Sequence, residues 1–184
     1  MSITKVDNVF SWEHINLINE IISTYETEDD YTLGRVYIGD IKYSFTQAIT
    51  DRLYKIVDDI SDAPLVIDHA LYAEYNGKHG QPNLPPHFDG DTNDLIINIQ
   101  LSSNTRWDLG LNLKTHQLED NSAMVFNGNT EIHWRPHKEF QEGEYVKMLF
   151  VRFYNARNRS NYDYLPMNQS DEIFKEVREL RDSL

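Results

Sequence analysis

The chain has 184 residues, which is enough for one compact domain with a sizeable core and too few for two ordinary domains. Hydrophobic residues make up 40% of it and aromatic residues 12%, a composition typical of a folded globular protein. Thirty acidic and seventeen basic side chains give a formal net charge of -13, which argues against a nucleic-acid backbone or an anionic membrane surface as partner and favours a basic or neutral one.

The sequence contains no cysteine, so disulfides and thiolate metal ligands are excluded, and any metal must be held by imidazole and oxygen atoms. The N-terminal stretch "MSITKVDNVFSWEH" lacks the pattern of a signal peptide, and no run approaches the ~20 apolar residues that span a bilayer. We therefore expect a cytoplasmic protein with a single domain over residues 1–184.

Three segments have the periodicity of amphipathic helices. The first, "SWEHINLINEIISTY" (11–25), opens with Ser11 as N-cap and carries isoleucines at helical spacing, Ile15, Ile18, Ile21 and Ile22. The second begins near Phe45 and runs through "TQAITDRLYKIVDDI", with one apolar stripe formed by Ile49, Leu53, Ile56, Val57 and Ile60. The third, "SDEIFKEVRELRDSL" (170–184), is expected to be capped by Ser170 and to turn inward Ile173, Val177 and Leu180.

Between the second and third helices the period becomes that of short strands, separated by Gly, Pro, Asn or Asp. The expected strands are 65–76, 94–102, 108–114, 121–128, 130–135 and 145–155. This order predicts a mainly β (α+β) fold, an antiparallel sandwich or jelly roll with the helices against one sheet. We expect a helical support in 1–64, the β core in 65–155 and a C-terminal extension with a helix in 156–184.

The stretch "NLPPHFDGDTNDLIINIQLS" (83–102) places His87 and Asp89 one residue apart, just before an apolar run. This pair alone is weak support for a metal site, because a loop histidine beside a turn-forming Asp gives the same pattern. A facial triad of two imidazoles and one carboxylate holds Fe(II) with coordination positions left open, but it needs a third ligand from elsewhere in the fold. His133, in "NSAMVFNGNTEIHWR" (121–135), is the candidate if a sheet brings it beside the pair; otherwise it is a half-buried strand histidine.

These segments resemble a known family. His87-Phe88-Asp89-Gly90, "LIINIQLS", "WDLGLNL", "LEDNSAMVFNGNTEIHW" and "YVKMLFVRFYN" are similar, in order and context, to the core of the Fe(II)/2-oxoglutarate-dependent dioxygenases, in particular the prolyl-4-hydroxylase-like group. The resemblance covers roughly residues 65–155. It implies a double-stranded β-helix, the cupin-like jelly roll, with two N-terminal helices packed on one sheet and a C-terminal helix added.

The resemblance also implies an activity: Fe(II), 2-oxoglutarate as cosubstrate and O2 would together hydroxylate an unactivated C–H bond. By analogy it favours a prolyl or other amino-acid or peptide substrate, which the sequence itself does not encode. Retention of Asp89 favours hydroxylation over halogenation, since the halogenases of the family lack this carboxylate. The alternative is a cupin-like metal-binding or structural protein without 2-oxoglutarate chemistry.

By the same resemblance His87, Asp89 and His133 would be the iron ligands and the catalytic centre. In the family a basic residue on the last core strand usually follows the distal His more closely than here, where Lys147 lies fourteen positions after His133 and ten after His137. Either the connecting loop is longer in this chain or His137 is the ligand. We favour His133, because it lies in an expected strand, whereas His137 follows a proline in a polar loop.

The resemblance assigns the far carboxylate of 2-oxoglutarate to Lys147 and to Tyr75, which lies on the strand before the His-x-Asp turn. Arg135 shares the strand face of His133 by period-two alternation and could supply or share this contact. Gln100 is a weaker candidate for the cosubstrate pocket. Arg152 has the opposite parity to Lys147 and is expected at the surface or against a helix.

The other conspicuous residues have ordinary structural explanations. Trp107 and Trp134 are expected to pack the sandwich or to wall the site. The loop 78–86 before His87 suits a lip over the site and a plain surface connection equally well. Four histidines have no partner at metal spacing and are expected to be exposed or structural: His14, His69, His79 and His116.

Overall fold

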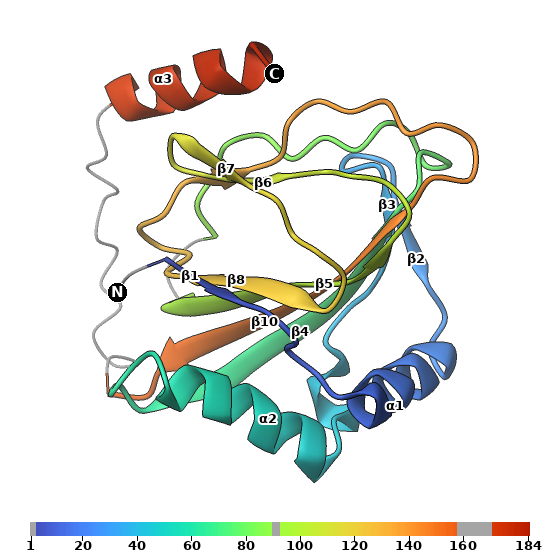
Figure 1. The fold of residues 1–184 in the computed structure, drawn as a ribbon, viewed down its shortest axis with the longest axis vertical. Helices are drawn as coiled ribbons and strands as arrows, with labels where there is room; N and C mark the ends of the chain where they lie inside the picture. Colours follow the sequence, from blue (N-terminus) through green and yellow to red (C-terminus); the bar gives the residue numbers. More distant parts are fainter. Residues whose placement is uncertain (1–2, 90–92, 158–170) are drawn as a thin grey trace.

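The computed structural model describes residues 3–89, 93–157 and 171–184, and it consists of two antiparallel sheets that face each other, with helices outside them (Figure 1). The larger sheet is built from β1 (Thr4–Val6), β2 (Glu28–Asp30), β3 (Arg35–Ile38), β4 (Leu65–Tyr75), β5 (Leu95–Ser103), β8 (Ser122–Phe126) and β10 (Val146–Asn155), in the order β1-β8-β5-β10-β4-β3-β2. The smaller sheet has β6 (Leu109–Leu111), β7 (Lys114–His116) and β9 (His133–Trp134), in the order β7-β6-β9.

All six strands expected from the sequence are present, and four further strands were not expected. β1, β2, β3 and β7 have three or four residues each, and two of them carry mostly charged or polar side chains, "EDD" and "KTH". Such short segments show no apolar alternation, so the sequence does not distinguish them from loops. They extend both sheets at their edges.

The helices begin and end close to the predicted limits. α1 (Trp12–Ser23) is capped by the Ser11 side chain, which accepts a hydrogen bond from the His14 backbone N–H, and α2 (Gln47–Asp58) is capped in the same way by Thr46. A short 3-10 helix, η1 (Ile41–Ser44), precedes α2. α3 (Asp171–Asp182) matches the third predicted helix, while Ser170, its expected cap, lies outside the described residues. Within the described residues, no helix combines the length and apolar character that crossing a membrane requires.

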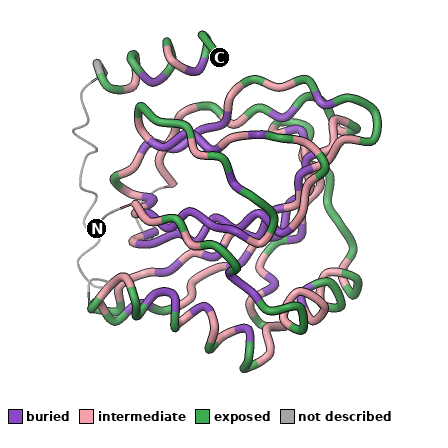
Figure 2. The backbone as a smooth tube through the Cα atoms, viewed as in Figure 1, coloured by how far each residue is buried: buried purple, intermediate pink, exposed green. Residues whose placement is uncertain are grey.

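Both faces of the large sheet are buried, because the helices cover one face and the small sheet covers the other (Figures 1 and 2). β10 shows the alternation directly: Leu149, Val151 and Phe153 pack in the core that includes α1 and α2, whereas Met148 packs in the core between the sheets. This double burial explains why β5 and β10 read as nearly continuous apolar runs. The prediction that two N-terminal helices pack on one sheet is confirmed.

α3 lies on the side of the small sheet, away from α1 and α2 (Figure 1). Its Val177 is fully buried with Ile132 and Trp134, and Phe174 packs against Phe88 with ring centroids 5.3 Å apart. The prediction that Ile173 faces inward was wrong, since this side chain is 41% exposed. The inward stripe runs through Phe174, Val177 and Arg181 at helical spacing, which turns the preceding residue outward.

The helix-side core provides a test of the fold. Leu53 on α2 is completely buried against the large sheet, so Leu53→Ala should lower the free energy of unfolding by about 2–5 kcal/mol. Leu113→Ala is the matched control, because Leu113 is 49% exposed and should cost no more than about 0.5 kcal/mol. Urea denaturation measures both, and equal losses in the two variants would contradict this packing.

Candidate metal centre and its pocket

Two backbone hydrogen bonds bring His87 and His133 together although they are far apart in the sequence. The N–H of each residue donates to the carbonyl of the other, at 3.1 Å and 3.0 Å, so the pair forms an antiparallel bridge at the edge of β9. Residues opposite each other in such a pair project their side chains to the same face. The two imidazole rings accordingly lie with centroids 4.1 Å apart.

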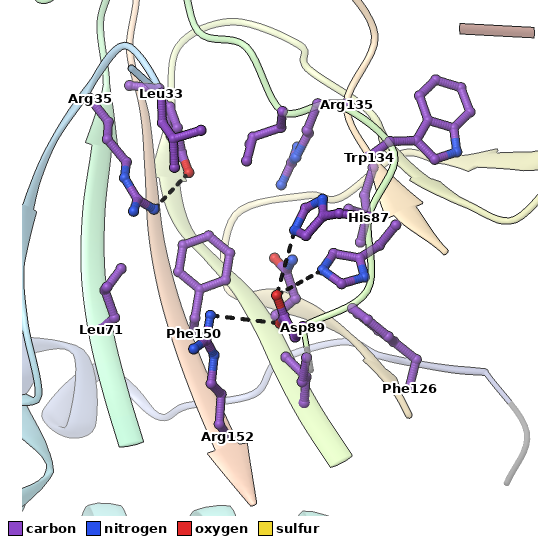
Figure 3. Close-up of a pocket in the computed structure, with 16 residues that line it drawn as sticks. Leu33, Arg35, Leu71, His87, Asp89, Phe126, Trp134, Arg135, Phe150 and Arg152 are labelled. Atoms are coloured by element: carbon purple, nitrogen blue, oxygen red, sulfur yellow. Dashed lines mark hydrogen bonds and ion pairs between the residues drawn. The ribbon is translucent and has the colours of Figure 1, made fainter. Parts of the chain in front are cut away.

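Asp89 completes a group of three. Its backbone N–H donates to the carbonyl of Gly128 at 3.0 Å, and its carbonyl accepts from the Asn93 side chain at 2.7 Å, which fixes the residue just after His87. Its Oδ1 lies 3.5 Å from His87 Nε2 and 3.3 Å from His133 Nε2 (Figure 3). One potential ligand atom from each of the three residues falls within 4.8 Å of the others, as a metal site requires.

The outer nitrogen of each imidazole is held by a backbone carbonyl. His87 Nδ1 lies 2.7 Å from the carbonyl of Pro85, and His133 Nδ1 lies 3.1 Å from that of Glu131. A carbonyl oxygen can only accept, so both Nδ1 atoms carry hydrogen, and in the neutral rings the Nε2 lone pairs point at Asp89. Three acceptor atoms then converge on one point, an arrangement that is stable only with a cation or protons between them.

The surroundings prepare these groups to hold a cation. Burial alone would raise the pKa of the Asp89 carboxyl, but the hydrogen bonds that His133 and His87 donate when protonated, together with the charge of Arg152, outweigh it and hold that pKa well below its ordinary value. Burial alone would lower the pKa of His87, but its hydrogen bonds to Asp89 and to the carbonyl of Pro85 raise it. Asp89 is therefore ionised at neutral pH, and protons compete with a metal at His87.

The three residues lie in the wall of a cavity of about 230 Å³ between the two sheets (Figure 3). Half of the lining residues are apolar and come from both sheets and the connecting loops, with Leu84 contributed by the loop that precedes His87. Besides the three potential ligands, its polar lining consists of Arg35, Tyr75, Asn98, Arg135 and Arg152. The cavity therefore combines apolar side chains with convergent polar and charged groups, as small-molecule sites commonly do.

Arg135 is the most buried of these charges, with 2% of its surface exposed. Its guanidinium donates to the carbonyl of Trp107 and lies 4.8 Å from the centroid of that ring, and Nη2 is 3.6 Å from the sulfur of Met148. Burial lowers the pKa of Arg135 to about 10, with Tyr75 and Asp108 acting in the opposite direction. Within the described part of the chain, Arg135 forms no ion pair with a carboxylate, so no carboxylate contacts its guanidinium directly beside the cavity.

Tyr75 lies beside this cation. The phenol is 1% exposed, its ring packs edge-on to Trp107 at 5.0 Å, and its oxygen accepts a hydrogen bond from Arg35 Nη1 at 3.4 Å. Arg35 in turn pairs with Asp30 at 3.0 Å. Burial raises the pKa of Tyr75, although Arg35 and Arg135 both favour the phenolate, so the hydroxyl stays protonated and can donate a hydrogen bond into the cavity.

The structure does not bring Lys147 into the cavity. Its amine lies 3.7 Å from Glu74 and its side chain is 39% exposed. The pocket face of β10 carries the even-numbered residues Phe150 and Arg152, so the expected parity was reversed. Arg152, predicted to lie at the surface or against a helix, instead lines the cavity and reaches to within 3.7 Å of Asp89 Oδ2. The sequence-based placements of both side chains are corrected accordingly.

Gln100 also lies away from the cavity. It is 3% exposed, and its amide donates to Ser103, to the carbonyl of Leu118 and to Asp120, which makes it a structural brace at the end of β5. The residue of β5 that does line the cavity is Asn98. Asn98 and Gln100 lie on the same face of β5, because they are two residues apart. The Gln100 amide, however, lies beyond the cavity and already donates to Ser103, Leu118 and Asp120.

The other histidines take structural or surface positions. His137, the alternative distal ligand, is 61% exposed and pairs with Asp182 at 3.4 Å, away from His87 and Asp89. His69 and His79 pair with Asp40 and Asp29, and His14 forms part of the α1 cap. Trp134 is 1% exposed and lines the cavity, and its ring covers Gly110 so closely that any side chain there would collide with it.

The C-terminal helix is tied to the same region. Arg181, 7% exposed, donates from Nε to the carbonyl of Arg135 at 2.8 Å and from Nη2 to the Asn83 side chain at 2.6 Å. Phe174 packs on Phe88, which lies between His87 and Asp89 in the sequence. α3 therefore buttresses both segments that supply the potential ligands.

Three polar residues of the cavity were not found by reading the sequence: Arg35, Asn98 and Arg152. A polar residue inside the apolar run "LIINIQLS" was a usable signal for Asn98, because an unpaired amide is rarely buried without a purpose. Arg35 had no such signal, since it lies on β3, a strand too short to recognise. For Arg152 the strand was recognised and only the face was wrong.

No protein-family model matches the chain, and no curated protein matches it in sequence. Solved structures match it in fold. The non-heme alpha ketoglutarate dependent epimerase SnoN from nogalamycin biosynthesis superposes with a TM-score of 0.66, covering 92% of this chain and 86% of that chain at 12% identity. HygX from Streptomyces hygroscopicus, with nickel and 2-oxoglutarate bound, gives 0.61 over 84% and 83% at 10% identity. A Pseudomonas putida prolyl-4-hydroxylase gives 0.57 over 83% and 92% at 11% identity.

These matches extend over most of each chain, so the chain has the jelly-roll fold of the 2-oxoglutarate/Fe(II) oxygenases. The predicted fold class is confirmed. At 10–12% identity the likeness establishes the fold and not the chemistry, which must be argued from the residues of this chain.

The choice between the two distal histidines can be tested by metal content. His133→Ala removes one of the three converging atoms and should abolish stoichiometric binding of Ni(II) or Fe(II). His137→Ala is the matched control and should bind metal like the parent, because His137 is exposed. Metal analysis after gel filtration distinguishes the two variants. Loss of metal in His137→Ala but not in His133→Ala would make His137 the distal ligand.

Metal binding should also depend on pH in a defined direction. A metal must displace the proton at His87, whose pKa is raised, so apparent affinity should be constant above that pKa and fall as pH decreases through it, by up to about tenfold per pH unit for each proton displaced. Asp89 adds nothing in this range because its pKa is lowered. Ni(II) titrations at successive pH values measure this, and a flat profile across the histidine range would contradict the assignment.

Proposed function

We propose that this protein is an Fe(II)- and 2-oxoglutarate-dependent oxygenase that hydroxylates a C–H bond, with the metal held by His87, Asp89 and His133. The observation that carries the proposal is the convergence of two imidazole Nε2 atoms and one carboxylate oxygen, each ring fixed by a backbone carbonyl on its other nitrogen. Two histidines and one carboxylate are the donor set of non-heme Fe(II) oxygenases.

The distances between the potential ligands fit a six-coordinate metal. Bonds of about 2.1 Å at right angles would put neighbouring ligand atoms about 3.0 Å apart. The two measured Nε2 to Oδ1 separations are 3.5 Å and 3.3 Å, so small side-chain movements suffice. The three residues line one part of the cavity wall, so a metal that they held would be accessible from the cavity.

Arg135 and Tyr75 are suited to hold the far carboxylate of 2-oxoglutarate. An isolated buried charge costs several kcal/mol, and a bound carboxylate would supply the partner that Arg135 lacks among the described residues. The guanidinium offers paired donors for a carboxylate, and the protonated Tyr75 hydroxyl offers another. Of the basic residues considered for this contact, we therefore favour Arg135 over Lys147, whose amine already pairs with Glu74.

When bound, Fe(II) and 2-oxoglutarate would supply the oxidising chemistry, in which O2 is consumed, 2-oxoglutarate becomes succinate and CO2, and one oxygen atom enters a substrate C–H bond. The chain itself would hold the metal ligands in place, orient the cosubstrate through Arg135 and Tyr75, and exclude water with the apolar wall. Phe126, 5.2 Å from the His133 ring, and Trp134 contribute to that wall.

For the prime substrate we keep an amino acid or peptide, prolyl or other, as the favoured class. Proteins of this fold differ in what they bind: HygX was solved with hygromycin B, and a prolyl hydroxylase from Trichoplax adhaerens was solved with a peptide fragment. The choice in this chain must follow from its own cavity.

The alternative is a metal-binding or structural protein of the same fold that does not use 2-oxoglutarate. Such a protein would need the three ligands at most. It would have no use for a buried guanidinium that lacks a carboxylate among the described residues, next to a protonated buried tyrosine. These two residues favour the oxygenase.

Anaerobic titration tests the proposal. The protein loaded with Fe(II) should bind 2-oxoglutarate with the weak visible charge-transfer band of such complexes. Arg135→Met should weaken 2-oxoglutarate binding by about 2 kcal/mol or more, roughly 30-fold, because it removes one partner of a buried ion contact. Lys147→Met is the matched control and should bind like the parent, because the Lys147 side chain is 39% exposed and pairs with Glu74.

Fe(II) binding by Arg135→Met, measured alongside, shows that the variant is folded. If the parent binds Fe(II) without any effect of 2-oxoglutarate, the metal-binding alternative is correct. If Lys147→Met loses the cosubstrate and Arg135→Met does not, the contact belongs to Lys147.

A further inference from the structure

The cavity has a charge opposite to that of the whole chain. The chain carries a formal charge of -13, yet the described residues that line the cavity include three arginines and one carboxylate, Asp89. With Arg135 assigned to the cosubstrate, Arg35 and Arg152 remain. A low-dielectric wall strengthens the field of such groups, so the chamber attracts anions even though the surface as a whole repels them.

Arg152 is the less compensated of these two. Its contact with a carboxylate is long, 3.7 Å from Nη2 to Asp89 Oδ2, and the other oxygen of Asp89 is turned toward the two imidazoles. Its Nε is buried and has no hydrogen-bond partner among the described residues. The Arg152 side chain is 34% exposed. A guanidinium has five N–H donors, and in a partly buried site most of them normally have hydrogen-bond partners.

Arg35 is nearer to neutral. Its Nε lies 3.0 Å from Asp30, and its Nη1 donates to Tyr75. It can strengthen the field in the cavity but has fewer donors to give to a ligand. Of these two arginines, Arg152 therefore has more N–H donors available for a ligand.

Asn98 adds a second unsatisfied group on the same wall. It is 4% exposed, it lines the cavity, and its Oδ1 has no hydrogen-bond partner among the described residues. It pairs across the sheet with Phe150, and Arg152 pairs with Ile96, so Asn98 and Arg152 are diagonal neighbours on the face of β5 and β10 that borders the cavity. A buried acceptor and a buried donor without partners, side by side, are suited to a ligand that offers an anion and an N–H or O–H group.

This wall is distinct from the proposed cosubstrate contact. Arg135 directly follows β9, and its guanidinium contacts Trp107, which lies just before β6 of the small sheet. Figure 3 shows Arg135 and Arg152 on opposite sides of the three potential ligands. A cosubstrate that extends from the metal to Arg135 leaves Arg152 and Asn98 free. The cavity of about 230 Å³ is below the roughly 300–1,000 Å³ of drug-sized sites, so what enters beside the cosubstrate must be small or a single side chain.

We propose that Arg152, assisted by Arg35 and Asn98, binds an anionic group of the prime substrate next to the metal, a carboxylate or a phosphate with a neighbouring hydrogen-bond donor. The inference rests on the proposed function, because it takes the metal and cosubstrate positions from it. It makes an acidic small molecule or residue the substrate class, against the basic or neutral partner that net charge alone favours.

The test uses protein loaded with Ni(II) and saturated with 2-oxoglutarate, so that the Arg135 contact is already filled. N-acetylglycine, its neutral amide N-acetylglycinamide, and methyl phosphate are added at matched ionic strength, and thermal stabilisation is converted to apparent affinity. The parent should bind one or both anions at least about tenfold more tightly than the amide, a difference of about 1.4 kcal/mol. The two anions distinguish carboxylate from phosphate.

Arg152→Gln should bring that ratio close to one, and Arg152→Lys should restore part of it because the charge returns. Lys147→Gln, on the other face of the same strand, is the matched control and should keep the parent ratio. Equal shifts for the anions and the amide in the parent, including no shift with any of them, would overturn the inference. Failure of Ni(II) or 2-oxoglutarate to bind at the first step would instead overturn the proposed function, so the two failures are separate.

Discussion

The site depends on the pair of backbone hydrogen bonds that His87 and His133 exchange. They place two imidazoles from distant segments on one face, and carbonyls of Pro85 and Glu131 then turn both Nε2 atoms toward Asp89. Because the contacts that orient both imidazoles are to the backbone, the geometry of the two histidines is set by the backbone itself. A metal would therefore bind to a largely prepared arrangement, with little side-chain entropy left to lose.

The larger sheet serves two purposes because both of its faces are buried. One face packs on α1 and α2 and supplies stability, and the other forms the cavity wall, so neighbouring residues of β10 have unrelated roles: Val151 packs in the helix-side core while Arg152 reaches Asp89. Because the face that packs on the helices supplies stability, the opposite face of the large sheet can carry polar groups in the cavity. α3 adds support from the other side, through Arg181 and Phe174.

The sign of the charge in the cavity is opposite to that of the whole molecule. The acidic surface surrounds a chamber whose lining includes Arg35, Arg135 and Arg152, and the most buried of the three has no carboxylate partner among the described residues. Stability alone does not explain this, since an uncompensated buried charge is unfavourable. Groups of this kind are typical of sites completed by a ligand, and here the two unsatisfied regions, at Arg135 and at Arg152 with Asn98, suit two anions.

The sequence by itself determined the three helices, six of the ten strands of the described residues and the jelly-roll class, because those segments have a clear periodicity and capping residues such as Ser11. It also singled out His87, Asp89 and His133, which the structure brings together, while their role as metal ligands stays a proposal. Only the tertiary structure decided which basic residues face the cavity. Side chains alternate between faces of a strand, so an error of one residue exchanges inside for outside, as with Lys147 and Arg152. When both faces of a strand are buried, its apolar run does not tell which residues belong to which face.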